Sequence, residues 1–154
     1  LNYAHLQNVV HRDIKPANIM FNIETDALKI TDFGIARLSD VSRTKTGIVL
    51  GTPSFMSPEQ LEGRPLDGRS DLFGLGVSLY QMLTGQLPFR ADSMTRLMNN
   101  IATEPHPPIR SLRPELPECM EQVIDRCLAK AADDRYQNGI DLADAIRNCM
   151  RGLT

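Results

Sequence analysis

The sequence has little of several features that would mark a particular class of protein. It contains no tryptophan, aromatic residues make up only 5% of it, and its 154 residues carry a formal net charge of −2. A charge so close to zero gives no reason to expect nucleic acid or an anionic membrane as a partner. Internal repeats and low-complexity tracts are also absent. The composition therefore favours an ordinary globular chain whose function must be inferred from motifs.

Cysteine is equally scarce. The chain has three cysteines, Cys119, Cys127 and Cys149, and none of them forms a C-x-x-C pair. An odd number of cysteines without such a pair argues against a zinc site and against a disulfide framework. We therefore expect three reduced thiols packed on helices, as in a cytoplasmic protein.

The chain also lacks a clear targeting segment. Its first ten residues, LNYAHLQNVV, have neither a basic start nor an apolar core, so they do not form a signal peptide. We expect them to form the end of a helix followed by a short strand at Val9 and Val10. A chain that opens inside a helix predicts a fragment of a longer protein.

One uncharged run, residues 72–89, approaches the lower length of a membrane span. Four polar residues interrupt it, namely Ser78, Gln81, Thr84 and Gln86. Gly85 and Pro88 then end the predicted helix early. This pattern favours a helix buried in a globular core and no membrane contact by this segment.

The remaining pattern divides the chain into two regions. Short apolar runs at 18–21 and 28–31 predict a β-hairpin. The long segment that follows is rich in Gly, Ser and Thr and shows little periodicity, which is typical of a functional or disordered loop. Apolar residues at helical spacing then predict helices near 70–84, 93–103, 117–129 and 139–150. The expected fold class is α+β and mainly helical.

Candidate chemistry lies in the decapeptide HRDIKPANIM, residues 11–20. It places a carboxylate (Asp13), an amine (Lys15) and a carboxamide (Asn18) within six residues. If the hairpin forms, its far end returns Asp32 beside Asn18, which gives two oxygen ligands of the kind that Mg²⁺ prefers. Lys15 can face a phosphate, and Asp13 can accept a proton from a hydroxyl nucleophile. These groups predict phosphoryl transfer.

Four motifs carry a resemblance to a known family. They are HRDIKPAN (11–18), DFG (32–34), GTPSFMSPE (51–59) and SDLFGLG (70–76). In this order they resemble the large, C-terminal lobe of eukaryotic-type protein kinases. The stretch TKTGIVLGT (44–52) is similar to bacterial receptor-type serine/threonine kinases. The resemblance covers essentially the whole chain.

The resemblance implies a domain organisation. The catalytic loop would span 11–18, the activation segment 32–59 and the helical subdomain 67–150. The hairpin would carry the catalytic and metal-binding loops. The small N-terminal lobe would be missing, because the chain contains no G-x-G-x-x-G motif and no V-A-I-K strand lysine.

Roles at the reaction centre follow from the same resemblance. Asp13 would be the catalytic base and Lys15 would stabilise the transferring phosphoryl group. Asn18 and Asp32 would hold Mg²⁺ or Mn²⁺. Thr52 would hydrogen-bond toward Asp13 and Lys15, and a lysine at position 15 is typical of serine/threonine kinases.

Three further residues would support ATP binding and the internal packing. Met20 would lie under the adenine ring of ATP, while His11 and Phe33 would stack in an internal apolar column. Simpler interpretations are a satisfied core histidine for His11 and plain hydrophobic filling for Met20.

The long loop suggests regulation by phosphorylation. Arg12 precedes the catalytic Asp13, an arrangement linked in this family to a phosphorylated activation segment, because an arginine there can pair with a phosphate. Candidate acceptors are Ser39, Ser42, Thr44 and Thr46. We favour Thr44 and Thr46, and the alternative is that they are ordinary polar loop residues.

Two structural pairs complete the resemblance. Glu59 is expected to pair with Arg135 and so anchor the loop to the late helices. Asp71, at the edge of the uncharged run, is expected to accept backbone hydrogen bonds from the catalytic loop around His11 and Arg12.

The function implied is that of a serine/threonine protein kinase, which transfers the γ-phosphoryl group of ATP to Ser or Thr hydroxyls of protein substrates. This piece alone would be inactive without its small lobe. A pseudokinase scaffold is the first alternative. A metal-dependent hydrolase using His11, Asp13 and Asp32 is the second, and it offers too few ligands. The segment is expected in the cytoplasm, which leaves open a membrane anchor elsewhere in the parent chain.

Overall fold

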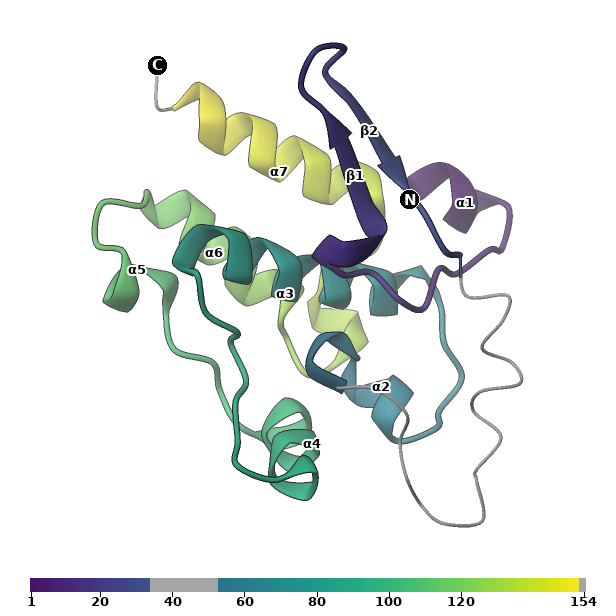
Figure 1. Cartoon of the computed structure of the whole chain (residues 1–154), viewed down its shortest axis with the longest axis vertical. Helices are drawn as coiled ribbons and strands as arrows, with labels where there is room; N and C mark the ends of the chain where they lie inside the picture. Colours follow the sequence, from purple (N-terminus) through teal and green to yellow (C-terminus); the bar gives the residue numbers. More distant parts are fainter. Residues whose placement is uncertain (34–52, 153–154) are drawn as a thin grey trace.

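The computed structural model describes residues 1–33 and 53–152. Its helices are α1 (Asn2–Leu6), α2 (Pro58–Leu61), α3 (Gly68–Thr84), α4 (Met94–Thr103), α5 (Ile109–Leu112), α6 (Glu118–Cys127) and α7 (Gly139–Arg151). The strands are β1 (Ile19–Asn22) and β2 (Ala27–Ile30). Figure 1 shows α3 across the middle, with the hairpin and α7 above it and α2 and α4 below it. The predicted α+β, mainly helical fold is confirmed.

Helix α3 is the central element. Asp67 caps its beginning by accepting a hydrogen bond from the Arg69 N–H, and Gly85 ends it in the left-handed conformation, with φ at 74°. Phe73, Val77 and Tyr80 are fully buried along it. The uncharged run is thus a core helix, as predicted. In the part of the chain that the structure describes, no helix has the length and apolarity that crossing a membrane requires.

The hairpin forms within one residue of its predicted bounds. Strands β1 and β2 pair antiparallel, with Ile19 opposite Ile30 and Asn22 opposite Ala27. The Asn22 side-chain oxygen accepts hydrogen bonds from the N–H groups of Glu24 and Thr25 and so fixes the turn. The residues that flank the hairpin, Asn18 and Thr31, are thereby brought side by side.

The strand predicted at Val9 and Val10 is wrong. The Val9 N–H donates to the carbonyl of Ala4, which closes the end of α1, and Asn8 turns the chain with φ at 59°. Two residues further on, the His11 N–H donates to the side chain of Asp71. These groups are therefore not presented to a neighbouring strand.

The expectation of three reduced cysteines is also wrong. Cys119 and Cys149 form a disulfide with a Cα–Cα distance of 5.6 Å, and it joins the first turn of α6 to the last turn of α7. Only Cys127 is free, and it is buried. The sequence could not pair these residues because their meeting depends on how two helices pack, not on spacing within one helix.

Two glycines inside α3 allow close packing on different sides of the helix. A Cβ atom at Gly76 would lie 2.5 Å from the Cβ of Cys127 on α6. A Cβ at Gly74 would lie 3.0 Å from the carbonyl oxygen of Ile14, which follows Asp13. Glycine costs about 1 kcal/mol against alanine within a helix. Here the absence of a side chain allows α6 and the segment after Asp13 to approach the α3 backbone.

We predict that Gly76→Ala destabilises the protein by about 1–2 kcal/mol. The new methyl group meets a Cβ atom fixed to the α6 backbone, and overpacking of this kind outweighs the gain in helix propensity. Urea denaturation of the variant and wild type measures the difference. The control is Gly152→Ala, whose Cβ would be in ordinary contact at 3.5 Å. Equal stabilities of Gly76→Ala and wild type would contradict the packing argument.

Candidate active site

Asp71 fixes the start of the predicted catalytic loop, residues 11–18. Its Oδ2 atom accepts a hydrogen bond from the His11 N–H and its Oδ1 atom accepts one from the Arg12 N–H, each at 2.8 Å. Arg12 has φ at 73°, a left-handed conformation that costs free energy for a residue with a side chain. Gln60 adds a third restraint by donating to the Arg12 carbonyl at 2.9 Å. Both predicted backbone bonds to Asp71 are present, and they hold a strained turn directly before Asp13.

The His11 ring links this turn to the end of the hairpin. Its Nε2 atom lies 2.7 Å from the carbonyl oxygen of Thr31, and its Nδ1 accepts a hydrogen bond from the Asp13 N–H at 3.1 Å. These partners assign the ring hydrogen to Nε2. The ring is fully buried, and its centroid lies 4.6 Å from that of Phe33. His11 is thus a satisfied core histidine that also contacts Phe33, although the two rings are tilted by 58° and are not stacked as predicted.

This arrangement argues against the hydrolase alternative. Both ring nitrogens of His11 already have backbone partners, so neither is available to a metal ion. Within residues 1–33 and 53–152, no group of three or more His, Cys, Asp or Glu side chains could hold a metal. The hypothesis of a metal site built from His11, Asp13 and Asp32 is therefore not supported.

Asp13, Lys15 and Asn18 come together at the beginning of β1. Asn18 donates from Nδ2 to the Asp13 carbonyl at 2.9 Å and to the Asp13 carboxylate at 3.0 Å. The Lys15 Nζ lies 3.8 Å from the same carboxylate oxygen, Oδ2. Pro16 begins a short 3₁₀ helix that ends at Asn18, and its fixed φ suits that first position. The carboxylate of Asp13 therefore lies close to both the amine of Lys15 and the amide of Asn18.

The hairpin carries Asp32 to the same end of the sheet. The Thr31 N–H donates to the Asn18 carbonyl at 2.8 Å, and Asp32 is the next residue along the chain. Asp32 is exposed and has φ at 55°. Because Asn18 directs its amide nitrogen at Asp13, its side-chain oxygen is the atom left to bind a cation. An amide oxygen and a carboxylate are ligands of the type that Mg²⁺ takes.

Some predicted site residues can be placed only in part or not at all. Met20 lies on β1 with 62% of its surface exposed, so the interpretation as core filling is wrong. Thr44, Thr46 and Thr52 lie outside the described residues, as do Ser39, Ser42 and Gly34 of the DFG motif. The roles assigned to those threonines stay predictions.

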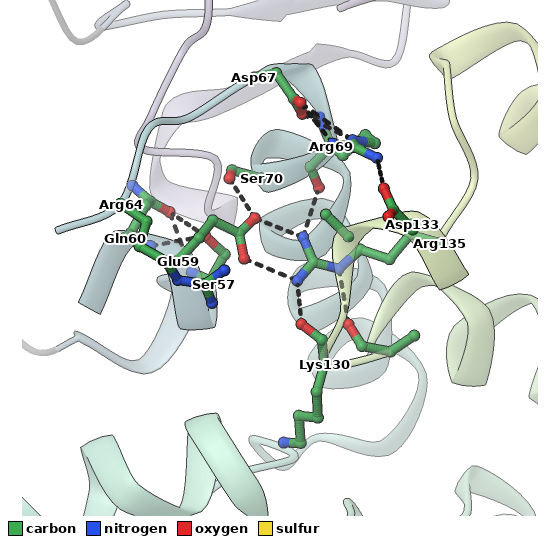
Figure 2. A network of polar contacts seen from close by, with 12 residues as sticks. Ser57, Glu59, Gln60, Arg64, Asp67, Arg69, Ser70, Lys130, Asp133 and Arg135 are labelled. Atoms are coloured by element: carbon green, nitrogen blue, oxygen red, sulfur yellow. Dashed lines mark hydrogen bonds and ion pairs between the residues drawn. The ribbon is translucent and has the colours of Figure 1, made fainter. Parts of the chain in front are cut away.

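Glu59 and Arg135 form the predicted ion pair. The two Nη atoms of Arg135 donate to the two carboxylate oxygens of Glu59 at 2.6 and 2.9 Å. Figure 2 shows the carboxylate and the guanidinium facing each other. Arg135 is fully buried, and its other hydrogen bonds go to the carbonyls of Ala129, Lys130 and Arg69. The pair ties α2 to the segment after α6.

The environment of Glu59 stabilises its charged form. Burial by itself would raise the pKa of Glu59, but hydrogen bonds from Arg135 and Ser70 outweigh it and lower the pKa from 4.5 to about 2. A buried charge persists at neutral pH only when it is paired and hydrogen-bonded in this way. The pair therefore links stability to pH.

Sequence reasoning missed three residues that support this site. The Nε2 atom of His5 lies 2.7 Å from Oδ2 of Asp71, Gln60 holds the Arg12 carbonyl, and the Ser70 hydroxyl donates to Glu59. Only Gln60 had a local signal, because Ser57 and Gln60 have the spacing of a helix capping box and form one. His5 and Asp71 are 66 residues apart, so no local pattern could join them.

Comparison with known proteins agrees with this geometry. The family model described as "Protein kinase domain" matches residues 1–147. The chain belongs to the protein kinase family. It is 45% identical over 156 residues to the serine/threonine-protein kinase Pkn1 of Myxococcus xanthus, covering 98% of this chain and 22% of that kinase. It is 43% identical over 152 residues to PknB of Mycolicibacterium smegmatis, covering 96% and 24% respectively.

Solved kinase structures show the same fold. The crystal structure of a double mutant of the Mycobacterium tuberculosis PknI kinase domain matches with a TM-score of 0.72 and 25% identity. The match covers 96% of this chain and 50% of that one. The predicted resemblance to bacterial serine/threonine kinases is confirmed. This chain spans less than a quarter of the length of Pkn1 and of PknB, and half of the PknI kinase domain chain.

We predict that Glu59→Gln destabilises this kinase chain by about 3–5 kcal/mol, because it leaves the buried Arg135 charge without its counter-ion. Chemical denaturation at neutral pH measures the loss. The control is Asp144→Asn, which removes a carboxylate from an exposed pair with Arg147 and is expected to cost less than about 1 kcal/mol. Similar losses for the two variants would contradict a special contribution from the buried pair.

We also predict an acid-dependent loss of stability through Glu59. Its folded-state pKa lies below the ordinary value, so its contribution is complete above about pH 4.5 and is lost as the pH falls toward 2. The full contribution is on the order of 3 kcal/mol. Unfolding free energies measured across this range should converge for wild type and Glu59→Gln. A difference that stays constant with pH would contradict this assignment.

Proposed function

We propose that this chain is the large-lobe part of a serine/threonine protein kinase. In the intact kinase it would transfer the γ-phosphoryl group of ATP to Ser or Thr hydroxyls of protein substrates. The observation that carries the proposal is the cluster of Asp13, Lys15 and Asn18, in which one carboxylate oxygen faces both the amine and the amide. The similarity to bacterial serine/threonine-protein kinases supports it.

Each of these side chains has a defined task in the proposed reaction. Asp13 accepts the proton of the attacking hydroxyl, and the hydrogen bonds from Asn18 orient its carboxylate for that purpose. Lys15 places a positive charge where charge develops on the transferring phosphoryl group. The protein mainly positions these groups, which is consistent with a loop fixed by proline and by Asp71.

ATP and a divalent cation are the cofactors that we propose. Asn18 and Asp32 are the residues that would hold Mg²⁺ or Mn²⁺, which supplies positive charge to the nucleotide phosphates when bound. Met20 would contact the adenine ring, and its exposure on β1 leaves it available for this contact. Because ATP is the phosphoryl donor, we place this part of the kinase in the cytoplasm.

The proposed partners are a small lobe and a protein substrate. The small lobe is expected because this chain covers half of the matched PknI kinase domain chain. Phosphorylation of Thr44 or Thr46 would give Arg12 an anionic partner and order the activation segment, residues 32–59. Thr52 would add a hydrogen bond toward Asp13 and Lys15.

A pseudokinase scaffold explains the arrangement less well. A protein that only binds partners has no need for an amide and an amine held on one carboxylate beside an exposed aspartate. Every described residue predicted to act in the reaction, Asp13, Lys15, Asn18 and Asp32, is present at that end of the hairpin. We therefore favour an active kinase.

We predict that Asp13→Asn in the kinase with its small lobe lowers kcat by about 10²–10⁴-fold, the usual contribution of a general base. The measurement is transfer from γ-labelled ATP to a Ser/Thr-containing acceptor protein. The control is Asp26→Asn, on the exposed hairpin turn at φ 52°, where asparagine is well tolerated. Unchanged kcat in Asp13→Asn, with an unchanged melting temperature, would overturn the proposal.

A further inference from the structure

The disulfide lies far along the chain from the catalytic loop and has no place in the proposed reaction. Cys119 is in the first turn of α6 and Cys149 is in the last turn of α7, 30 residues later. Their Cα atoms are 5.6 Å apart, within the range that a disulfide spans without backbone movement. The fold therefore presents two thiols already positioned to bond.

A cavity gives outside reagents a route to this pair. It has a volume of about 400 Å³, and Cys119, Gln122, Asn148, Cys149 and Gly152 are among the residues that line it. Cys119 is partly exposed, whereas only 4% of the Cys149 surface is accessible. A small thiol or disulfide that enters the cavity would meet the Cys119 sulfur first.

The third cysteine, Cys127, lies in a different environment from the other two. Cys127 is fully buried between α3 and α6, and burial raises the pKa of its thiol to about 12. Thiolates, not thiols, attack disulfides, so Cys127 is unreactive in the folded protein. The chain thus carries one inert thiol and one accessible pair.

We propose that Cys119 and Cys149 are a reversible modification site for low-molecular-weight disulfides and thiols. In the reduced protein, the Cys119 thiolate attacks a small disulfide RSSR, forms a Cys119–S–SR bond and releases one RS⁻. The Cys149 thiol then loses its proton to solvent and attacks the Cys119 sulfur, which completes the protein disulfide and releases a second RS⁻. The cysteines lose two electrons and RSSR gains them, and excess RSH reverses both steps.

Oxidation ties down one end of α7. The beginning of α7 is held by the Asn138 cap and by a hydrogen bond from the Gly139 N–H to the Asn2 side chain. Its first turn packs through the buried Leu142 on the cluster around α3 and α6, and Ala145 and Ile146 continue this contact along the middle of the helix. The disulfide is the covalent tether of its last turn, so reduction removes that tether and lowers the stability of the chain. Cytoplasmic disulfides are usually transient in this way.

The test equilibrates the full 154-residue chain in buffers that run from excess oxidised to excess reduced glutathione. Native alkylation followed by mass spectrometry counts the free thiols, and thermal unfolding is measured in parallel. We expect none to be alkylated in the oxidised buffers and two, Cys119 and Cys149, in the reduced ones. Cys127 reacts only after denaturation. Reduction should lower the melting temperature by roughly 5–10 °C.

Variants separate this site from a fixed structural bridge. Cys119→Ser, Cys149→Ser and the double variant should melt near reduced wild type, and none should gain the higher melting temperature of the oxidised wild type in any redox buffer. Cys149→Ser should accumulate a glutathione adduct on Cys119, whereas Cys119→Ser should form little on Cys149. A bond that survives excess reduced glutathione, thiols that stay free in oxidised glutathione, or a redox response retained in Cys119→Ser would each overturn the proposal.

Discussion

The structure depends on one carboxylate, that of Asp71. It accepts backbone hydrogen bonds from His11 and Arg12 and also contacts the ring of His5, while only 2% of its own surface is exposed. The predicted catalytic loop has a strained residue, Arg12, immediately before the predicted base. Such strain persists only where surrounding contacts determine the conformation. Because Asp71 belongs to α3, a helix with much of its length buried, the position of Asp13 is fixed relative to the core and not to a surface loop.

The ion pair of Glu59 with Arg135 contains a second buried carboxylate that is held in place by several hydrogen bonds. Two ions in an apolar interior lose more hydration free energy than their attraction returns unless further hydrogen bonds complete them. Here the arginine reaches both carboxylate oxygens and three carbonyls, and Ser70 adds a donor to the glutamate. The pair thereby makes the packing specific. The hydrogen bonds of Glu59 and Arg135 all form in one arrangement of α2, α3 and the segment after α6.

Much of this arrangement could be predicted because its signals are local. The hairpin, the four longer helices and the Asp13–Asn18 motif follow from alternation, helical spacing and a six-residue pattern. The long-range pairs of Glu59 with Arg135 and of Asp71 with the loop were predictable only by resemblance to a family. Contacts that have neither a local sequence pattern nor a family resemblance behind them were missed. The His5–Asp71 contact and the Cys119–Cys149 bond depend on how separate helices pack, and no period within one helix encodes that packing.

The two glycines of α3 allow both the predicted catalytic loop and α6 to pack against the same helix. Gly74 lets the chain after Asp13 approach one side of the helix, and Gly76 lets Cys127 of α6 approach another. At such separations neither partner can move toward α3 without displacing its backbone, because close-packed interiors do not compress. Helix α6 also carries Cys119, so the redox-active pair and the catalytic loop are both fixed against α3. The central helix therefore has to remain rigid if the loop that carries Asp13 is to keep its position beside the hairpin.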